Sequence, residues 1–119
     1  MSKSNFKATY SLEQRIEEAQ KVRSKYPDRL PVIVEKQQTA TIADIDKTKF
    51  LVPADLTMGQ FIHIIRKRVQ LKPSEAIFVF VNNTIPCSSN TMAQVYENGK
   101  DEDGFLYVLY ANENTFGSQ

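Results

Sequence analysis

Cys87 and His63 are the only side chains of this sequence that could form a sulfur–imidazole pair of nucleophile and base. His63 falls on the polar side of a predicted helix, and Cys87 follows Pro86 in a polar stretch with no evident third group to orient the pair. A solvated histidine and a loop cysteine account for both residues. No phosphate-binding loop is indicated either, because the glycines are scattered: Gly59, Gly99, Gly104 and Gly117. We therefore expect a protein that is not an enzyme.

The composition also limits other kinds of site. One cysteine excludes a disulfide framework and a cysteine-based zinc site, so we expect no metal and no cofactor. A concentrated basic patch with interleaved aromatic residues, typical of nucleic-acid binding, is missing. Residues 1–36 hold eight Lys/Arg and five Asp/Glu, whereas residues 90–119 hold one and five. This asymmetry can steer partners of either sign, although an ordinary solvated surface explains it equally well.

The sequence shows no segment that would insert into a membrane or direct the chain to one. No apolar run is long enough to span a bilayer, and residues 1–5 resemble neither a signal peptide nor a myristoylation signal. We therefore expect a cytoplasmic protein, whose attachment to any membrane must come from an added group.

One glycine near the end of the chain could carry such a group. The sequence ends in Glu113-Asn-Thr-Phe-Gly117-Ser-Gln. A glycine carbonyl is open to attack because no Cβ shields it, and glycine fits a narrow enzyme channel. Many protein tails contain glycine, so this feature decides nothing alone.

The elements that would position these residues begin with an N-terminal helical region. A capping box starts at Ser11, apolar residues follow at spacings of three and four, and Pro27 ends the helix. Residues 5–10 predict another short turn in which Phe6 and Tyr10 pack together. We assign residues 1–27 to a helical extension.

The rest of the chain alternates strands and helices. Apolar runs predict strands at residues 30–36, 49–52, 77–81 and 105–110. The first two would form a hairpin, and the third, apolar throughout, is expected in the centre of the sheet with both faces covered. A helix over 57–71 and a short turn over 91–96 complete an α+β fold: a β-grasp domain, 28–111, with a four-stranded mixed sheet packed on a helix. Residues 112–119 form a tail with no periodicity.

The helix over 57–71 has a broad apolar face. At about 100° per residue, one sector gathers the expected core residues Met58, Phe61, Ile62, Ile65 and Val69. Ile64 falls about 60° outside this sector, and Arg68 projects between Phe61 and Ile64. An apolar strip with a cation beside it is therefore expected, although a wide core face with an arginine reaching to water would look the same.

The strand at 49–52 has the marks of a protected sheet edge. It is short, carries Lys47 and Lys49, and ends at Pro53. Such an edge, flanked by apolar pockets, can bind an extended peptide by strand addition, and its lysines favour acidic peptides. The alternative is an edge that is charged only to prevent aggregation.

Several stretches then indicate a known family. They are YPDRLPVIVEK at 26–36, DIDK at 44–47, LVPADLT at 51–57, GQF at 59–61, RKR at 66–68, KDEDGFLYV at 100–108 and ENTFG at 113–117. Through these, nearly the whole chain resembles the autophagy-related protein 8 family, the GABARAP and light-chain-3 type ubiquitin-like modifiers. The resemblance implies a ubiquitin-like β-grasp fold with two N-terminal helices.

The resemblance also implies a conjugation chemistry. A cysteine protease would remove Ser118 and Gln119, and activating and conjugating enzymes would carry Gly117 as thioesters. Gly117 would end as an amide on phosphatidylethanolamine, so that a cytoplasmic protein also resides on autophagosomal or vacuolar membranes. An unconjugated adaptor in vesicle trafficking, or one that contacts tubulin through its basic front, is the alternative.

Family members also bind acidic aromatic-x-x-aliphatic motifs of cargo receptors and adaptors. The implied aromatic pocket consists of Glu18, Val22, Pro31, Ile33, Lys49, Leu51 and Phe105. The implied aliphatic pocket consists of Phe50, Val52, Pro53, Leu56, Phe61 and Ile64. The implied partners of the acidic residues or the peptide backbone are Arg29, Lys47 and Arg68. A second family surface, for helical motifs, would map to residues 78–80, where burial is the stronger interpretation.

The chain departs from the family pattern in a few loops. Residues 37–41 replace a more charged loop, Ala43 stands where a proline is common, and residues 87–90 and 111–112 are unusual. None of these positions is Gly117 or an implied pocket residue, so the departures concern the choice of partner.

Overall fold

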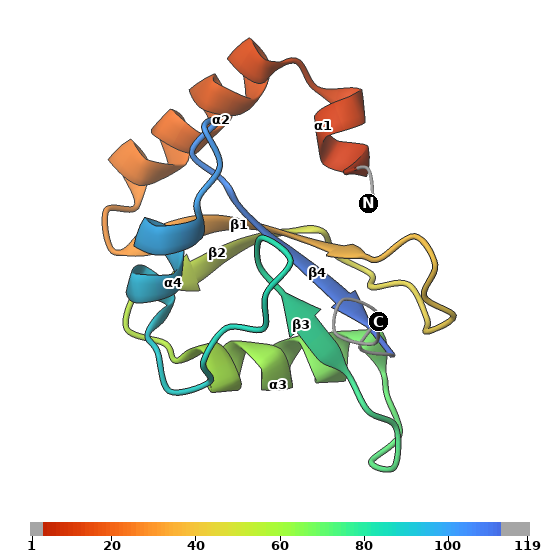
Figure 1. The fold of residues 1–119 in the computed structure, drawn as a ribbon. Coiled ribbons are helices and arrows are strands. Elements are labelled where there is room, and N and C mark those ends of the chain that lie inside the picture. Colours follow the sequence, from red (N-terminus) through yellow and green to blue (C-terminus); the bar gives the residue numbers. More distant parts are fainter. Residues whose placement is uncertain (1–3, 113–119) are drawn as a thin grey trace.

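The computed structural model describes residues 4–112 of the chain. Figure 1 shows a twisted sheet with two N-terminal helices over one face and a third helix under the other. The helices are α1 (Asn5–Thr9), α2 (Leu12–Lys25), α3 (Met58–Val69) and α4 (Met92–Gly99). The strands are β1 (Arg29–Lys36), β2 (Lys49–Pro53), β3 (Phe78–Phe80) and β4 (Leu106–Ala111).

The four strands form one mixed sheet in the order β2-β1-β4-β3. β1 and β4 run parallel at its centre, and each has an antiparallel neighbour at the edge. The predicted hairpin is confirmed, with Arg29 opposite Pro53 and Ile33 opposite Lys49. The predicted α+β β-grasp architecture, with its N-terminal helical extension, is therefore present.

The predicted central position of the third strand is wrong. β3 has three residues and pairs only with β4, so it lies at a sheet edge. The prediction rested on its apolar run, and Val79 and Phe80 are indeed buried. Burial on both faces comes from the layers that cover a sheet and not from strands on both sides, so an edge strand can be equally apolar.

Strand alternation divides the core into two parts. On the α3 side, Val32 and Val34 pack with Phe61 and Ile65 in the main cluster. On the other side, Ala19 of α2 packs with Ile33 and Phe105 in a smaller cluster, against which Phe6 of α1 rests. The helical extension therefore covers a sheet face that would otherwise be exposed.

Helix boundaries follow the capping chemistry of the sequence. The predicted boxes at Ser11 and Thr57 are both formed, and Thr91 begins α4 with a third. α3 ends at Val69, two residues before the expected end, because Gln70 takes a left-handed conformation with φ 63°. The short turn before α2 is the helix α1, and the rings of Phe6 and Tyr10 pack 5.0 Å apart as predicted.

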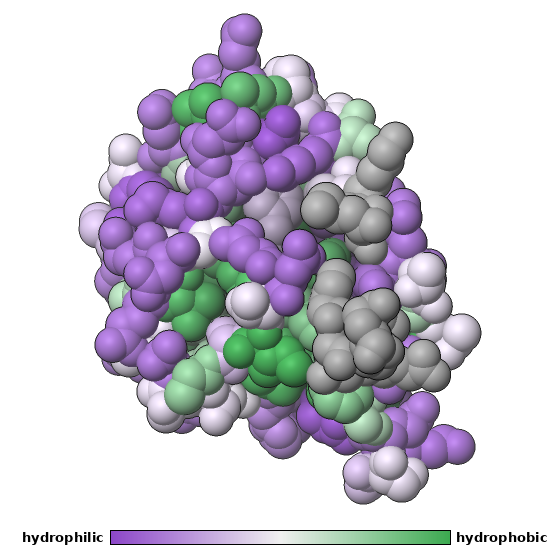
Figure 2. All heavy atoms as spheres, in the orientation of Figure 1, coloured by the Kyte–Doolittle hydropathy of each residue, from purple (hydrophilic) through white to green (hydrophobic). Residues whose placement is uncertain are grey.

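The surface in the orientation of Figure 1 is mostly polar. In Figure 2, apolar residues appear as separate patches between hydrophilic side chains. Among the residues that the structure describes, no helix is long and apolar enough to cross a membrane.

Gly104 lies in the turn before β4 and is packed tightly against α2. Its φ is +91°, and a Cβ there would lie 3.0 Å from the Cβ of Ala19. Both the backbone conformation and the contact oppose a side chain.

We predict that Gly104→Ala lowers the free energy of unfolding by about 1–3 kcal/mol, because alanine is strained at this φ. Urea unfolding followed by circular dichroism measures the change. The matched control is Glu102→Ala, an exposed residue of the same turn, for which less than about 0.5 kcal/mol is expected. Equal stability of the two variants would contradict the explanation.

Candidate functional site

β2 offers one free side of its backbone. It is an edge strand, as predicted, and pairs only with β1 (Figure 1). The Thr48 carbonyl accepts the N–H of Val34 at 2.8 Å, so the alternation of the antiparallel ladder turns the N–H and C=O of Leu51 to the open side. The Leu51 carbonyl receives a long hydrogen bond from the Arg29 guanidinium, at 3.3 Å. A second strand could therefore pair here if Arg29 moved.

A hollow of about 560 Å³ lies between α2 and β2 on one side of this edge. Six of the predicted peptide-binding residues line it: Glu18, Val22, Arg29, Lys47, Lys49 and Leu51. The structure thus brings together residues from α2, β1, β2 and the segment before β2.

Three residues of the predicted aromatic pocket do not line this hollow. Pro31 is buried, and Ile33 and Phe105 are each 0% exposed. The reason is that α2 packs down through Ala19, while the ring of Phe6 stands edge-on to Phe105 at 5.1 Å. These residues lie beneath the site, in the sheet and the small core, and not in its open wall.

Charge dominates the mouth of the hollow. The Lys49 ammonium donates a hydrogen bond to the Glu18 carboxylate at 2.8 Å. This bond lowers the pKa of the Glu18 carboxyl from its ordinary value. Five cationic side chains line the hollow against this single carboxylate: Lys21, Lys25, Arg29, Lys47 and Lys49.

The other side of β2 is more closed than predicted. Phe50, Val52 and Phe61 of the implied aliphatic pocket belong to the main core. The rings of Phe50 and Phe61 meet edge-on at 5.7 Å, so they pack on each other inside this core. Pro53 and Leu56 are half-buried, and Ile64 is 37% exposed. Of the six implied residues of the aliphatic pocket, these three are the ones with more than a small exposed surface.

Two cations stand over this closed side. The Lys47 ammonium lies 5.0 Å and the Arg68 guanidinium 5.9 Å from the centre of the Phe50 ring. Arg68 also pairs with Asp46 at 3.4 Å, and a smaller hollow of about 290 Å³ beside it includes Ile64. Ile64 and Arg68 therefore line one hollow at the edge of α3, whereas Phe61 is buried in the main core.

Three residues that line the hollow between α2 and β2 were not predicted from the sequence: Lys21, Lys25 and Tyr26. Lys21 and Lys25 are three and seven positions after Glu18, so their helical spacing places them on the same side of α2. That spacing is a signal from which they could have been found.

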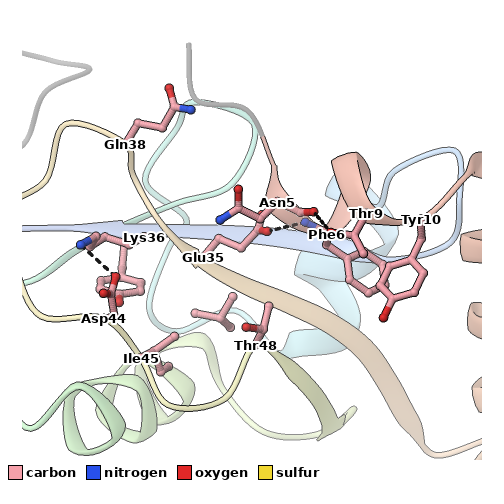
Figure 3. Close-up of a pocket in the computed structure, with 12 residues that line it drawn as sticks. Asn5, Phe6, Thr9, Tyr10, Glu35, Lys36, Gln38, Asp44, Ile45 and Thr48 are labelled. Carbon is pink, nitrogen blue, oxygen red and sulfur yellow. Dashed lines mark hydrogen bonds and ion pairs between the residues drawn. The ribbon is translucent and has the colours of Figure 1, made fainter.

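A larger hollow of about 680 Å³ lies elsewhere and was not predicted. Figure 3 shows it between α1, the end of β1 and the segment before β2. Glu35 accepts the backbone N–H of Phe6 at 3.0 Å across it, and Lys36 pairs with Asp44 at 2.9 Å. None of the predicted site residues lines this hollow. Its walls come from distant segments, so no local pattern marks it.

The two residues considered for nucleophilic chemistry are both exposed. The Cys87 sulfur lies 3.1 Å from the Ser89 hydroxyl, and this hydrogen bond lowers the pKa of the thiol. In the part of the chain that the structure describes, no group of three or more His, Cys, Asp or Glu could hold a metal ion.

Comparison with known proteins assigns the chain to a family. A family model described as the ubiquitin-like autophagy protein Atg8 matches residues 14–117. The chain belongs to the Atg8 family. The matched range covers all the predicted groove residues and ends at Gly117. Gly117 itself lies outside the residues that the structure describes, as do Ser118 and Gln119.

Relatives from plants match the Atg8 chain along its length. Autophagy-related protein 8B of Oryza sativa is 57% identical over 117 residues, covering 98% of this chain and 98% of the relative. Autophagy-related protein 8a of Arabidopsis thaliana is 57% identical over 118 residues, covering 99% and 97%. The chain is thus a ubiquitin-like autophagy protein.

Solved Atg8 structures share the fold. Trypanosoma brucei ATG8 superposes with a TM-score of 0.87 at 49% identity, covering 92% of this chain and 95% of that one. Plasmodium falciparum Atg8, solved in complex with a Plasmodium falciparum Atg3 peptide, gives 0.86 at 37% identity, covering 93% and 98%.

The Lys49–Glu18 pair gives a test of the electrostatics of the groove. We predict that Lys49→Met raises the pKa of the Glu18 carboxyl, because the hydrogen bond that favours its charged form is lost. Carbon-detected NMR titration of the side-chain carboxyl measures the midpoint. Lys36→Met, which breaks a pair with Asp44 instead, is the matched control and should leave Glu18 unchanged. An unmoved Glu18 midpoint in Lys49→Met would contradict the pairing.

Proposed function

We propose that this Atg8 protein is a non-enzymatic modifier, conjugated through Gly117 to phosphatidylethanolamine, that recruits cargo receptors during autophagosome formation. The observation that carries the proposal is the open edge of β2, with a cationic hollow on one side and apolar surface on the other, in a chain of this family. The ligand would be an acidic peptide with an aromatic-x-x-aliphatic motif.

An extended peptide would first pair with the backbone of Leu51. Successive side chains of a strand point to opposite faces, so a peptide beside β2 presents residues to both sides of the sheet. Its aromatic side chain would enter the hollow between Val22 and Leu51. Its aliphatic side chain would reach the surface of Leu56 and Ile64, near the edge of α3.

The charges of the site suit acidic flanking residues. Five cations and one carboxylate surround the hollow, so a peptide carboxylate would be attracted to Lys49 or Lys47. Lys49 would have to exchange Glu18 for the peptide, and both partners are about half exposed, so the exchange costs little.

The aliphatic side of the groove requires more rearrangement. Phe50 is packed on Phe61 and covered by Lys47 and Arg68. A bound aliphatic side chain would displace the two cations from the Phe50 ring and rest on it. Because this reorganisation offsets part of the burial energy, micromolar affinity is expected.

Attachment to lipid is supported by the family and by the place of Gly117 in the sequence. β4 ends at Ala111, and five residues lie between it and Gly117, so that six Cα–Cα steps give a contour of at most about 22 Å. This length lets an enzyme reach Gly117 without unfolding the sheet. The Plasmodium Atg8 neighbour, solved with an Atg3 peptide, supports a conjugating enzyme as a partner of this chain.

The proposed sequence of reactions uses the Gly117 carbonyl throughout. A cysteine protease hydrolyses the bond between Gly117 and Ser118 and leaves a free carboxylate. The activating enzyme adenylates this carboxylate with ATP, releasing pyrophosphate, and its thiol displaces AMP to form a thioester. The glycyl group then passes to the thiol of the conjugating enzyme. The amine of phosphatidylethanolamine finally displaces the enzyme thiol and forms an amide. Two acyl chains then anchor the cytoplasmic protein to autophagosomal or vacuolar membranes, at about 0.8 kcal/mol per buried CH₂.

We predict that Gly117→Ala abolishes the lipid-linked form, because a side chain at this position blocks the narrow channels of the processing enzymes. Incubation with the matching protease, activating and conjugating enzymes, ATP and phosphatidylethanolamine vesicles, followed by mass spectrometry, measures the product. Ser118→Ala, beyond the cleaved bond, should remain a substrate. Lipidation of Gly117→Ala would refute conjugation at this residue, and membrane activity independent of Gly117 would favour the unconjugated adaptor.

We predict that Leu51→Ala weakens binding of an acidic aromatic-x-x-aliphatic peptide by about five- to tenfold, through lost apolar contact. Leu51 is preferred to Phe50 because Phe50 belongs to the core and its loss would destabilise the fold. Isothermal titration calorimetry measures the affinity. Ile85→Ala removes an exposed apolar side chain from the loop after β3 and serves as control. Equal affinities of the two variants would reject the groove.

A further inference from the structure

A buried carboxylate joins α2 to the start of β4. The side chain of Asp103 is 0% exposed. Its Oδ2 accepts hydrogen bonds from the Arg15 guanidinium and the Tyr107 hydroxyl, each at 2.6 Å. Its Oδ1 accepts the backbone N–H of Phe105 at 2.8 Å. We call Asp103, Arg15 and Tyr107 the Asp103 clamp.

The clamp has a well-defined geometry because a buried charge is costly unless its donors stay in place. Asp103 accepts hydrogen bonds from α2, from β4 and from the backbone just before β4, so movement of α2 would leave a carboxylate without its cation. Burial, and the hydrogen bond to Asp103, raise the pKa of the Tyr107 hydroxyl, which therefore remains a donor. These short charge-assisted bonds are stronger than hydrogen bonds between neutral groups.

The same helix forms one wall of the groove. Arg15 and Glu18 are three positions apart on α2, which makes them neighbours along the helix. Glu18 and Val22 line the hollow beside β2, while Arg15 enters the clamp and Ala19 lies against the Gly104 turn. The position of the aromatic subsite therefore depends on contacts made at the other flank of α2.

The opposite wall of the groove does not depend on α2. The residues of the aliphatic side come from β2, α3 and the turn between them, and Phe50, Val52 and Phe61 among them belong to the main core under the sheet. A shift of α2 would consequently change one half of the groove and leave the other in place.

We propose that Asp103 is a positioning residue that, through Arg15, sets the separation of α2 from β2 and so the affinity of the aromatic subsite. It does not contact the peptide. The inference rests on the proposed peptide-binding function. It adds a residue on which binding of the aromatic part of the motif depends.

An ion pair on α1 serves as the internal control for the Asp103 clamp. Lys7 pairs with Asp101 at 2.6 Å and lies 4.6 Å from the centre of the Tyr107 ring. This pair is more exposed than the clamp and holds α1, which contributes no residue to the hollow beside β2. Loss of the Lys7 pair should therefore leave the aromatic subsite unchanged.

The test compares two peptides on the wild-type protein and on Asp103→Asn. One synthetic peptide contains Asp-Asp-Asp-Trp-Ser-Ser-Leu, and the other has alanine in place of tryptophan. NMR chemical-shift titration measures both affinities, including weak ones. We expect Asp103→Asn to reduce binding of the tryptophan peptide by about fivefold or more and that of the alanine peptide by less than about twofold, because only the aromatic subsite is disturbed.

A general loss of structure gives a different result. Partial unfolding would weaken both peptides by the same factor, and an equal loss would therefore overturn the proposal, as would unchanged affinity for the tryptophan peptide. If Asp103→Asn does not fold, Tyr107→Phe removes one donor and keeps the ion pair, and a selective loss of about twofold to threefold is expected. Lys7→Met is the matched control, with both affinities unchanged.

The same titrations separate the two proposals. A wild-type protein that binds neither peptide would reject the groove, and the positioning role with it. A wild-type protein that prefers the tryptophan peptide, with the same preference in Asp103→Asn, would reject the positioning role alone.

Discussion

The ionic hydrogen bond between Arg15 and the buried carboxylate of Asp103 connects the helical extension to the sheet domain. An isolated carboxylate with no solvent contact would be strongly unfavourable, so this contact constrains where α2 lies. The small core of Ala19, Ile33 and Phe105 then closes beneath the helix. The hollow beside β2 is the space that remains once this packing is satisfied, and its shape follows from the anchor on the far flank of the helix.

The two sides of β2 differ in how ready they are for a ligand. The side facing α2 is open and cationic, whereas the side facing α3 is filled by Phe50 and Phe61 and covered by Lys47 and Arg68. Recognition of a peptide would therefore combine a preformed subsite with one that must rearrange. Charge attraction at the open side can bring the peptide into place before Lys47 and Arg68 move away from the Phe50 ring on the closed side.

Local chemistry predicted most of the fold. The boxes at Ser11 and Thr57, the β1–β2 hairpin and the edge position of β2 follow from short-range rules, and all are present. The edge position of β3 could not be read from its apolar run, because burial does not distinguish helical cover from strand neighbours. The burial of Ile33 and Phe105 was missed because it depends on how α1 and α2 fold back, which involves contacts between distant residues. The roles of the individual groove residues and of Gly117 remain predictions.

The two edges of the sheet bear on how copies of this protein would behave under the proposed attachment to a vesicle. β3 offers three residues, and β2 offers five, with the exposed Lys49 at its start and Pro53 at its end. Short or charged edges are poor templates for another sheet. Neighbouring molecules tethered to the same bilayer would thus be discouraged from polymerising edge to edge, and the free side of β2 would stay available to incoming peptides. Dense decoration of a surface without fibril formation is the property that this edge architecture favours.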